Sequence, residues 1–331
     1  MAKHPEMQYY SVSEIESRLG SVRMDEFVRS SEEDFLQKMS DIAAAVAWSD
    51  KVKVIFISGP TSSGKTTSTN RLAGALGLRG KHAVKLSLDD YYIDFEKPKV
   101  VNGWYDFENP ETLDLDMIRD DIERLLDGGT VNPPHFNFKE RRREWHGTNE
   151  LSLKNDDVLL VEGLHGLSSH VAGHLDPDLW YGIMLRPWAT IATDRTLLTA
   201  RDIRMMRRIS RDAHSRNTSA LATIDYWPML DQTEDRFFPE YTERADVFIN
   251  TCVAYEFCII PHLAAEQIEK DLELLERAEL PPSLYVEPPL EYVDLEAALE
   301  QANHLLRASK KLPYVTKRQV PRMSILNEFI N

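Results

Sequence analysis

A run of residues early in the chain has the types and spacing that hold phosphate groups. Gly59-Pro60-Thr61-Ser62-Ser63-Gly64-Lys65-Thr66 fits the pattern G-x-x-x-x-G-K-[ST] in full. The glycines let the backbone turn sharply, so that loop amides and the positive end of a following helix point at an anion. The lysine of such a loop reaches the β- and γ-phosphates, and the next hydroxyl holds magnesium. We expect nucleotide binding by Gly59, Thr61, Ser62, Ser63, Gly64, Lys65, Thr66 and Thr67.

Acidic residues stand at the ends of two apolar runs, where a phosphate site needs them. Asp89 and Asp90 follow residues 82–88, and Glu162 ends residues 157–162. The carboxyl ends of parallel strands are where such sheets place their ligands. A carboxylate there can accept a proton from an attacking hydroxyl or help to hold a metal ion. The alternatives are a pair of turn or helix-capping aspartates and, for Glu162, an ordinary surface acid.

Several arginines share one face of a predicted helix over residues 190–215. Their spacings of three and four residues place them on much the same side: Arg204, Arg207, Arg208 and Arg211. Such a local concentration in a chain of net charge -15 suggests an anion site, since arginine provides forked donors for phosphate oxygens. The alternative is a solvated helix face paired with Asp202 and Asp212.

The elements that must position these residues can be identified from apolar runs. The runs are nearly all apolar rather than alternating, which is typical of strands buried on both faces: 51–58, 82–88, 157–162, 180–186 and 245–251. Helical patterns lie between them, among them residues 65–77 and 112–127. The chain is therefore predicted to have an α/β fold, with a parallel sheet of about five strands and helices on both faces.

The chain divides into three predicted parts. Residues 1–50 form a helical N-terminal segment, residues 51–262 a nucleotide-binding domain, and residues 263–331 a mainly helical extension that packs on this domain. A proline-rich link at 280–292 is expected to be extended.

Composition narrows the class of partner. The net charge of -15 over 331 residues argues against general nucleic-acid binding and against docking on anionic membranes. No apolar run approaches the roughly 18 residues that span a bilayer. The N-terminal residues lack the apolar core of a secretory signal. Cys252 and Cys258 fit neither a redox motif nor a zinc site, and a cytoplasmic location is the default expectation.

Together these motifs resemble the uridine kinase branch of the uridine kinase and phosphoribulokinase-like P-loop kinases. The resemblance covers roughly residues 50–262 and is carried by an ordered series: "GPTSSGKTT", "SLDDYY", "YDFENPETLD", "PPHFNF", "VEGLHGL", "RRISRD" and "ADVFIN". The ending "SILNEFI" and Trp227-Pro228 look like a longer bacterial uridine kinase-like group. The resemblance implies the P-loop NTPase kinase fold, with helical extensions at both ends.

The resemblance also implies a role for individual residues. Asp89 matches the base that takes the proton of a nucleoside 5′-hydroxyl, with Lys65 beside it as a catalytic cation. Thr66, Glu162 and Asp89 match magnesium-associated positions, and Glu108 falls where an aspartate holds the ribose hydroxyls. Arginines of a lid that closes over the phosphates and the substrate match Arg208, Arg211 and Arg216. Other expected acceptor contacts are Tyr91, Phe136, Phe138, Arg141 and Arg208.

The base-reading positions depart from the family pattern. Phe136 stands where these kinases have a tyrosine, and Arg141 falls where they have a histidine. Aromatic faces for stacking remain, but the usual hydrogen-bonding groups do not. The run "KERRRE" at 139–144 is expected to be the exposed turn of a hairpin, with contact to an anionic acceptor as the alternative.

The expected activity is transfer of the γ-phosphate of ATP, with Mg²⁺, to the 5′-hydroxyl of a nucleoside of the uridine or cytidine type. One alternative is a P-loop kinase for another small hydroxyl acceptor, such as a sugar phosphate or a pantothenate-like alcohol. Another is a non-catalytic nucleotide-binding regulator, although such a protein has no need of an acceptor-side base. A switch GTPase would need an N-K-x-D motif, which the sequence lacks. The expected partners are ATP and a small acceptor, with a homo-oligomer as a family possibility.

Overall fold

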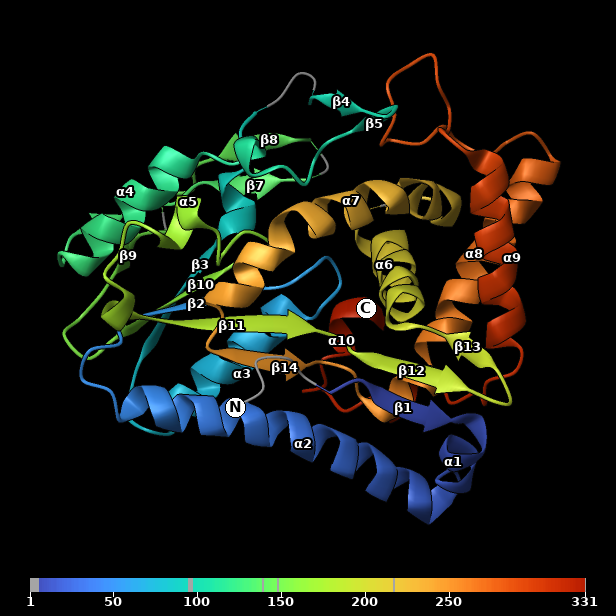
Figure 1. Cartoon of the computed structure of the whole chain (residues 1–331), viewed down its shortest axis with the longest axis horizontal. Coiled ribbons are helices and arrows are strands. Elements are labelled where there is room, and N and C mark those ends of the chain that lie inside the picture. Colours follow the sequence, from blue (N-terminus) through green and yellow to red (C-terminus); the bar gives the residue numbers. More distant parts are fainter. Residues whose placement is uncertain (1–5, 95–97, 139, 148, 217, 331) are drawn as a thin grey trace.

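The centre of the molecule is a five-stranded sheet in which every pairing is parallel. The computed structural model describes residues 6–94, 98–138, 140–147, 149–216 and 218–330. The sheet order is β14-β11-β2-β10-β3 (Figure 1). The strands are β2 (Val54–Ser58), β3 (Ala83–Ser87), β10 (Val158–Glu162), β11 (Trp180–Arg186) and β14 (Val247–Asn250). These strands lie within the five apolar runs, so the predicted α/β fold with a parallel sheet is confirmed.

Both faces of the sheet are buried, which explains why the strands are apolar throughout. In β2, Ile55 and Ile57 belong to one hydrophobic cluster, and Val54 and Phe56 belong to another. Successive side chains of a strand point to opposite faces, so each face has its own core. The sheet is thereby a rigid platform whose strand ends can hold a site.

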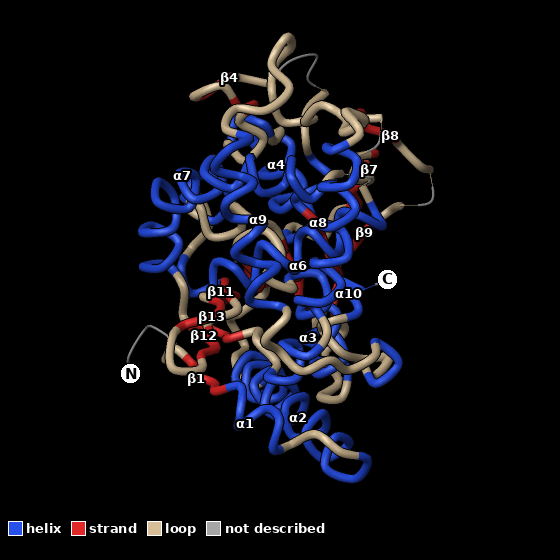
Figure 2. The backbone as a smooth tube through the Cα atoms, turned by 90° about the vertical axis from the view of Figure 1, so that its right-hand side faces the viewer, coloured by secondary structure: helices blue, strands red, loops and turns tan. Residues whose placement is uncertain are grey.

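Helices cover this platform (Figures 1 and 2). They are α1 (Val12–Ser17), α2 (Ser21–Ala47), α3 (Lys65–Gly77), α4 (Leu115–Leu126), α5 (Ser169–Ala172), α6 (Ala200–Ser215), α7 (Ala220–Arg244), α8 (Ile260–Glu276), α9 (Leu295–Ser309) and α10 (Asn327–Ile330). The long α2 packs along α3, while α6 packs on α8 and α7 on α9. The division into an N-terminal segment, a kinase domain and a C-terminal extension stays a prediction. Within the described residues, no helix combines the length and apolar character needed to cross a membrane.

The predicted helix over 190–215 begins later than expected, and the first 50 residues are not wholly helical. β12 (Ala189–Ala192) pairs in parallel with β1 (Gln8–Ser11) and antiparallel with β13 (Thr196–Leu198). The helix α6 starts only after Thr199, whose side chain and that of Asp202 form a capping box. The predicted start of the helix over 190–215 was wrong because β12 is a short strand that is stabilised by a partner about 180 residues away in the chain. The N-terminal segment contains the predicted helices, α1 and α2, and the strand β1 lies before them.

In the described part of the chain, three two-stranded sheets lie beside the main sheet, and both strands of two of them are labelled in the upper part of Figure 1. They pair β4 (Val100–Val101) with β5 (Trp104–Tyr105), β6 (Thr130–Val131) with β9 (Leu151–Ser152), and β7 (His135–Asn137) with β8 (Arg142–Glu144). The turn before β8 exposes Glu140 and Arg141, as predicted for the run at 139–144, of which Lys139 lies outside the described residues.

Candidate active site

The phosphate-binding loop joins β2 to α3 as its sequence requires. Gly64 precedes the helix with a φ of 85°, in the left-handed region that favours glycine. Gly59 lies so close to β11 that an added Cβ would be 2.5 Å from the Leu185 carbonyl oxygen. The Lys65 ammonium donates to the carbonyl oxygens of Gly59 and Pro60, at 3.0 and 3.2 Å.

Two hydroxyls of the phosphate-binding loop lack a hydrogen-bond partner in the described part of the chain. The side-chain oxygens of Ser62 and Ser63 are buried and form no hydrogen bond with any described residue. Buried polar atoms are rarely left unsatisfied, and binding sites are among the places where this occurs. The loop thus contains polar groups that are available to a ligand.

Glu162 lies at the end of β10 beside this loop, and it is buried. Its carboxylate accepts hydrogen bonds from the hydroxyls of Thr66 (3.4 Å) and Ser87 (3.3 Å). Burial, together with the nearby negative charge of Asp89, raises the pKa of Glu162 to about 7. The alternative of an ordinary surface acid is therefore wrong, because the strand end carries this side chain into the interior.

These oxygen atoms fit a magnesium ion. Among the residues that the structure describes, no three histidine, cysteine, aspartate or glutamate side chains form a ready-made metal site. Magnesium does not require one, because it is usually held by one or two carboxylates together with substrate phosphates. A buried carboxylate whose proton affinity is raised, next to a hydroxyl of the phosphate loop, is suited to a divalent cation.

Asp89 and Asp90 lie in the 3₁₀ turn Leu88–Tyr91 after β3, but they are in different environments. The Asp90 carboxylate is bound to the ring of His135 at 2.9 Å and accepts the Phe136 N–H at 3.2 Å. Asp90 therefore anchors β7, which matches the turn-residue alternative. Asp89 has no hydrogen-bond partner among the described residues and lies close enough to influence Glu162. Of the two, only Asp89 is placed to act on a ligand.

Two of the four arginines on the predicted helix face are structural. Arg204 and Arg207 are almost completely buried and pair with Glu234 and Glu256. Their guanidinium groups also reach carbonyl oxygens of the phosphate loop, at Thr61 (3.3 Å) and Ser62 (3.4 Å). The solvated-face alternative is wrong for these residues, because α6 packs directly against the loop.

Asp212 gathers the three arginines that the family resemblance assigns to a lid. It lies within 3.3 Å of Arg208, 2.7 Å of Arg211 and 3.8 Å of Arg216. Burial alone would raise the pKa of Asp212, but the three guanidinium groups outweigh burial and lower it to about 2. Arg208 and Arg216 line the neighbouring cavity, whereas Arg211 does not.

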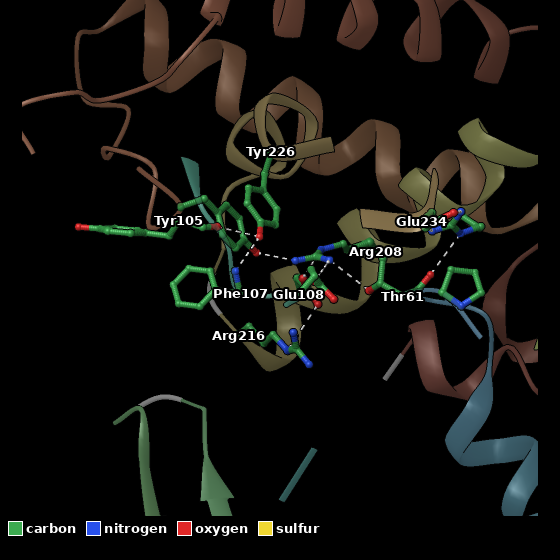
Figure 3. A network of polar contacts seen from close by, with 12 residues as sticks. Thr61, Tyr105, Phe107, Glu108, Arg208, Arg216, Tyr226 and Glu234 are labelled. Atoms are coloured by element: carbon green, nitrogen blue, oxygen red, sulfur yellow. Dashed lines mark hydrogen bonds and ion pairs between the residues drawn. The ribbon is translucent and has the colours of Figure 1, made fainter. Parts of the chain in front are cut away.

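A cavity of about 460 Å³ opens beside these arginines. Its wall contains one carboxylate, Glu108, and is otherwise largely aromatic and cationic: Tyr92, Ile93, Phe107, Thr112, Phe136, Phe138, Arg141, Arg208, Arg216, Thr218, Leu284 and Tyr285. Figure 3 shows Arg208 between Thr61 of the phosphate loop and Glu108. The structure therefore brings five predicted acceptor contacts together: Glu108, Phe136, Phe138, Arg141 and Arg208.

One predicted acceptor contact is corrected. Tyr91 is completely buried, and its hydroxyl donates to Asp121 of α4 at 2.7 Å. The next residue, Tyr92, lines the cavity instead. Adjacent residues of a turn point in different directions, and the sequence offers no means of telling the two tyrosines apart.

Glu108 is positioned by a buried histidine that the sequence analysis did not single out. His165 donates from Nε2 to the Glu108 carbonyl oxygen at 2.8 Å, since a carbonyl can only accept. Its Nδ1 therefore accepts from the Tyr241 hydroxyl at 2.6 Å. Burial lowers the pKa of His165 from its usual 6.5 to about 3, so this ring is neutral in the folded protein.

This histidine makes the fold sensitive to acid. Because the pKa is lower in the folded state, the stabilisation is complete above pH 6.5 and is lost as the pH falls towards 3. Between pH 7.5 and 5.0, His165 alone should lower the free energy of unfolding by about 2 kcal/mol. Urea unfolding at both values measures this change. His165→Gln should show a smaller loss than wild type, and an equal loss in the two proteins would contradict the assignment.

The C-terminal segment reaches the phosphate loop. The Glu328 carboxylate in α10 accepts from the Thr67 N–H at 3.2 Å and from its hydroxyl at 3.1 Å. Ile325 lies against Gly64, where an added Cβ would overlap it. An anion is thus already bound at the first turn of α3, where phosphate is expected. Glu328 lies in the ending "SILNEFI", which the sequence motifs picked out, but that motif gave no role to this glutamate.

Removing the charge of Glu328 should favour nucleotide binding. Glu328→Gln is expected to lower the Kd for a non-hydrolysable ATP analogue by about threefold to tenfold, because the phosphate no longer competes with a carboxylate for the Thr67 amide. Calorimetric titration measures the affinity. Glu276→Gln, at the exposed end of α8, makes the same change in net charge and should leave Kd unaltered. Weaker binding by Glu328→Gln would show that the carboxylate assists the nucleotide instead.

Comparisons with known proteins find similarity to one family of kinases. The family model described as "Phosphoribulokinase / Uridine kinase family" matches residues 54–186. A uridine kinase of Schizosaccharomyces pombe is 29% identical over 181 residues, which are 54% of this chain and 35% of that protein. Uridine kinases of Halobacterium salinarum and Staphylococcus aureus are 25% and 27% identical, over 59% of this chain and 78% and 86% of their own lengths. The recognition of this family from the sequence motifs is confirmed.

The matches cover only part of this chain and, for one relative, only part of the other protein. The chain spans about a third of the S. pombe protein that it matches and more of the other two. The family match leaves Tyr285 and Glu328 outside residues 54–186. The residues that close the site from the C-terminal side therefore belong to a part of the chain that the family model does not describe.

Proposed function

We propose that this chain, whose residues 54–186 match the phosphoribulokinase and uridine kinase family model, transfers the γ-phosphate of Mg-ATP to the hydroxyl of a small ring-bearing acceptor, a nucleoside 5′-hydroxyl in the first instance. The observation that carries the proposal is the 460 Å³ cavity beside the phosphate loop, with one carboxylate and several aromatic side chains in its wall. Flat rings stack on aromatic faces, and a carboxylate accepts hydrogen bonds from sugar hydroxyls.

Each part of the site then has a role. The loop amides and Lys65 hold the donor phosphates, and Thr66 with Glu162 would hold magnesium. When bound, magnesium neutralises charge on the phosphate oxygens. Asp89 accepts the proton of the acceptor hydroxyl, and Arg208 stabilises negative charge between the loop and the cavity.

The deciding experiment measures ADP release from Mg-ATP against a panel of nucleosides, with pantothenate, ribulose 5-phosphate and no acceptor as controls. Acceleration by one or more nucleosides supports the proposal. Saturable ATP binding without turnover of any acceptor would favour a nucleotide-binding regulator and would overturn it.

A second candidate is an acceptor that carries a negative charge. The Arg141 guanidinium lies over the Phe107 ring at 4.5 Å and lines the cavity, and no carboxylate of the described residues lies within ion-pair distance of it. An uncompensated guanidinium is suited to phosphate or carboxylate. Faster turnover of ribulose 5-phosphate than of any nucleoside, lost in Arg141→Gln, would select this candidate.

A further inference from the structure

The acceptor cavity has a wall that comes from the proline-rich link near the end of the chain. The segment Ser283–Val286 lies against β5, where Val286 forms an isolated antiparallel bridge with Trp104. The Tyr105 N–H donates to the Tyr285 carbonyl oxygen at 2.8 Å. The backbone of this segment is therefore fixed to the main body of the protein at the cavity, and the segment places Leu284 and Tyr285 in its wall.

The ring of Tyr285 is held on both sides. It stacks on Tyr226 of α7, with ring centroids 4.1 Å apart and planes within 12°. It also meets the edge of Phe107, at 6.3 Å. Tyr285 is 7% exposed, so these contacts leave it little freedom to change rotamer. A side chain fixed in this way can define the shape of a binding site.

The hydroxyl of Tyr285 is directed at Arg208, which lies between the phosphate-binding loop and the acceptor cavity. It accepts a hydrogen bond from Arg208 at 3.1 Å. The same guanidinium contacts the Thr61 hydroxyl of the phosphate loop at 3.1 Å and the Glu108 carboxylate at 3.5 Å. Figure 3 shows the contacts of Arg208 with Thr61 and Glu108. Tyr285 is thus the C-terminal partner of a group that faces both the donor phosphates and the acceptor.

The Tyr285 hydroxyl also retains a hydrogen for a ligand. A phenol can donate one hydrogen bond and accept others. As Arg208 has no acceptor atom in its guanidinium, the Tyr285 oxygen must be the acceptor in that contact. Its own hydrogen finds no acceptor among the described residues, although the side chain lines the cavity.

We infer that Tyr285 is a specificity-determining residue of the acceptor site, which holds Arg208 in place and donates a hydrogen bond to the acceptor substrate. This inference rests on the proposed phosphotransfer. It assigns part of the active site to a segment about 100 residues beyond the family match. The ring limits the acceptor to compounds that fit beside a fixed aromatic wall, and the hydroxyl selects those with a hydrogen-bond acceptor at that point.

The test compares two tyrosines of the same link. Tyr285→Phe removes only the hydroxyl in the cavity. Tyr292→Phe removes a hydroxyl that fastens the link to the Pro281 carbonyl oxygen at 2.9 Å, and Tyr292 does not line the cavity. We expect Tyr285→Phe to lower kcat/KM for the acceptor by about tenfold to a hundredfold, the usual value of a hydrogen bond to a charged group. The KM for ATP should stay unchanged, and Tyr292→Phe should retain the wild-type kcat/KM.

A second variant tests the ring. Tyr285→Leu should also reduce the ratio of kcat/KM for the best nucleoside to kcat/KM for pantothenate, which has no ring. Equal kinetics for Tyr285→Phe and Tyr292→Phe would overturn the inference.

Failure of the proposed kinase function can be distinguished from failure of the inference about Tyr285. If no acceptor in the panel is phosphorylated by the wild type, the nucleoside kinase proposal fails. The slow hydrolysis of Mg-ATP without acceptor then reports on Arg208, which contacts the phosphate loop in either case. Slower hydrolysis in Tyr285→Phe than in Tyr292→Phe would support the placement of Arg208 by Tyr285, and equal hydrolysis would refute it.

Discussion

Asp89→Asn should lower kcat by about two to four orders of magnitude, which is the usual contribution of a positioned general base. Asparagine keeps the size of the side chain but cannot accept the proton of the acceptor hydroxyl. Binding of a non-hydrolysable ATP analogue should persist, because the phosphate loop is unchanged. Steady-state kinetics and calorimetric titration measure the two properties. A variant that retains a near-normal kcat would remove Asp89 from the mechanism.

The adjacent aspartate is the matched control for this prediction. Asp90→Asn makes the same change one residue further along, at a side chain that anchors His135 and Phe136 of β7. It should raise the KM for the acceptor by loosening the hairpin that carries Phe136, while kcat falls far less than in Asp89→Asn. Equal losses of kcat in both variants would indicate that the turn, rather than the base, was damaged.

Glu256→Gln should destabilise the protein by about 3–5 kcal/mol, because it leaves a buried charge without its counterion. The Arg207 and Glu256 side chains are 0% and 1% exposed, and their contacts measure 2.5 and 2.8 Å. The other partners of the guanidinium among the described residues are neutral: the carbonyl oxygens of Thr251 (2.9 Å) and Ser62 (3.4 Å), the Thr251 hydroxyl (3.5 Å) and the Phe329 ring (4.8 Å). Denaturant unfolding, followed by two probes to establish cooperativity, measures the loss.

Two further variants test whether the loss of stability in Glu256→Gln comes from the unpaired buried charge. Glu33→Gln removes the counterion of Arg29 in a pair whose side chains are 69% and 66% exposed, and such surface pairs contribute at most about 1 kcal/mol. The double variant Arg207→Met with Glu256→Leu removes both buried charges and should recover most of the stability lost by Glu256→Gln. Failure of the double variant to recover would mean that the pair is required for its shape rather than for its charge balance.

The parts of this protein that local sequence determines were predicted correctly. The phosphate loop was predicted from its glycine spacing and from the helix that starts at Lys65. The five strands were predicted from continuous apolar runs, which are typical of a sheet that is buried on both faces. Each of these patterns lies within about twenty residues, so neighbouring residues are sufficient to indicate the structure. The same holds for Glu162, which ends an apolar strand and lies beside the loop.

The parts that depend on distant partners were decided only by the tertiary structure. Arg204 and Arg207 are buried in ion pairs, with a carboxylate of α7 and with one of the turn before α8. Arg208 and Arg216 line the cavity instead. The helical spacing of the four arginines does not indicate which of them meets a carboxylate of another element. Residues 189–192 became a strand because β1 was available to pair with them, and residues 196–198 then pair with that strand.

The clearest cases are Tyr285 and Glu328, which reach the site from the end of the chain. Glu328 contacts a residue 261 positions away, and Tyr285 bonds to Arg208 across 77 positions. A tyrosine in a proline-rich link and a glutamate in a short helix carry no local signal of function. The sequence by itself therefore determined the donor loop and the sheet that holds it, since both are built from neighbouring residues. Only the folded chain decided which side chains enclose the acceptor, because packing at long range selects them.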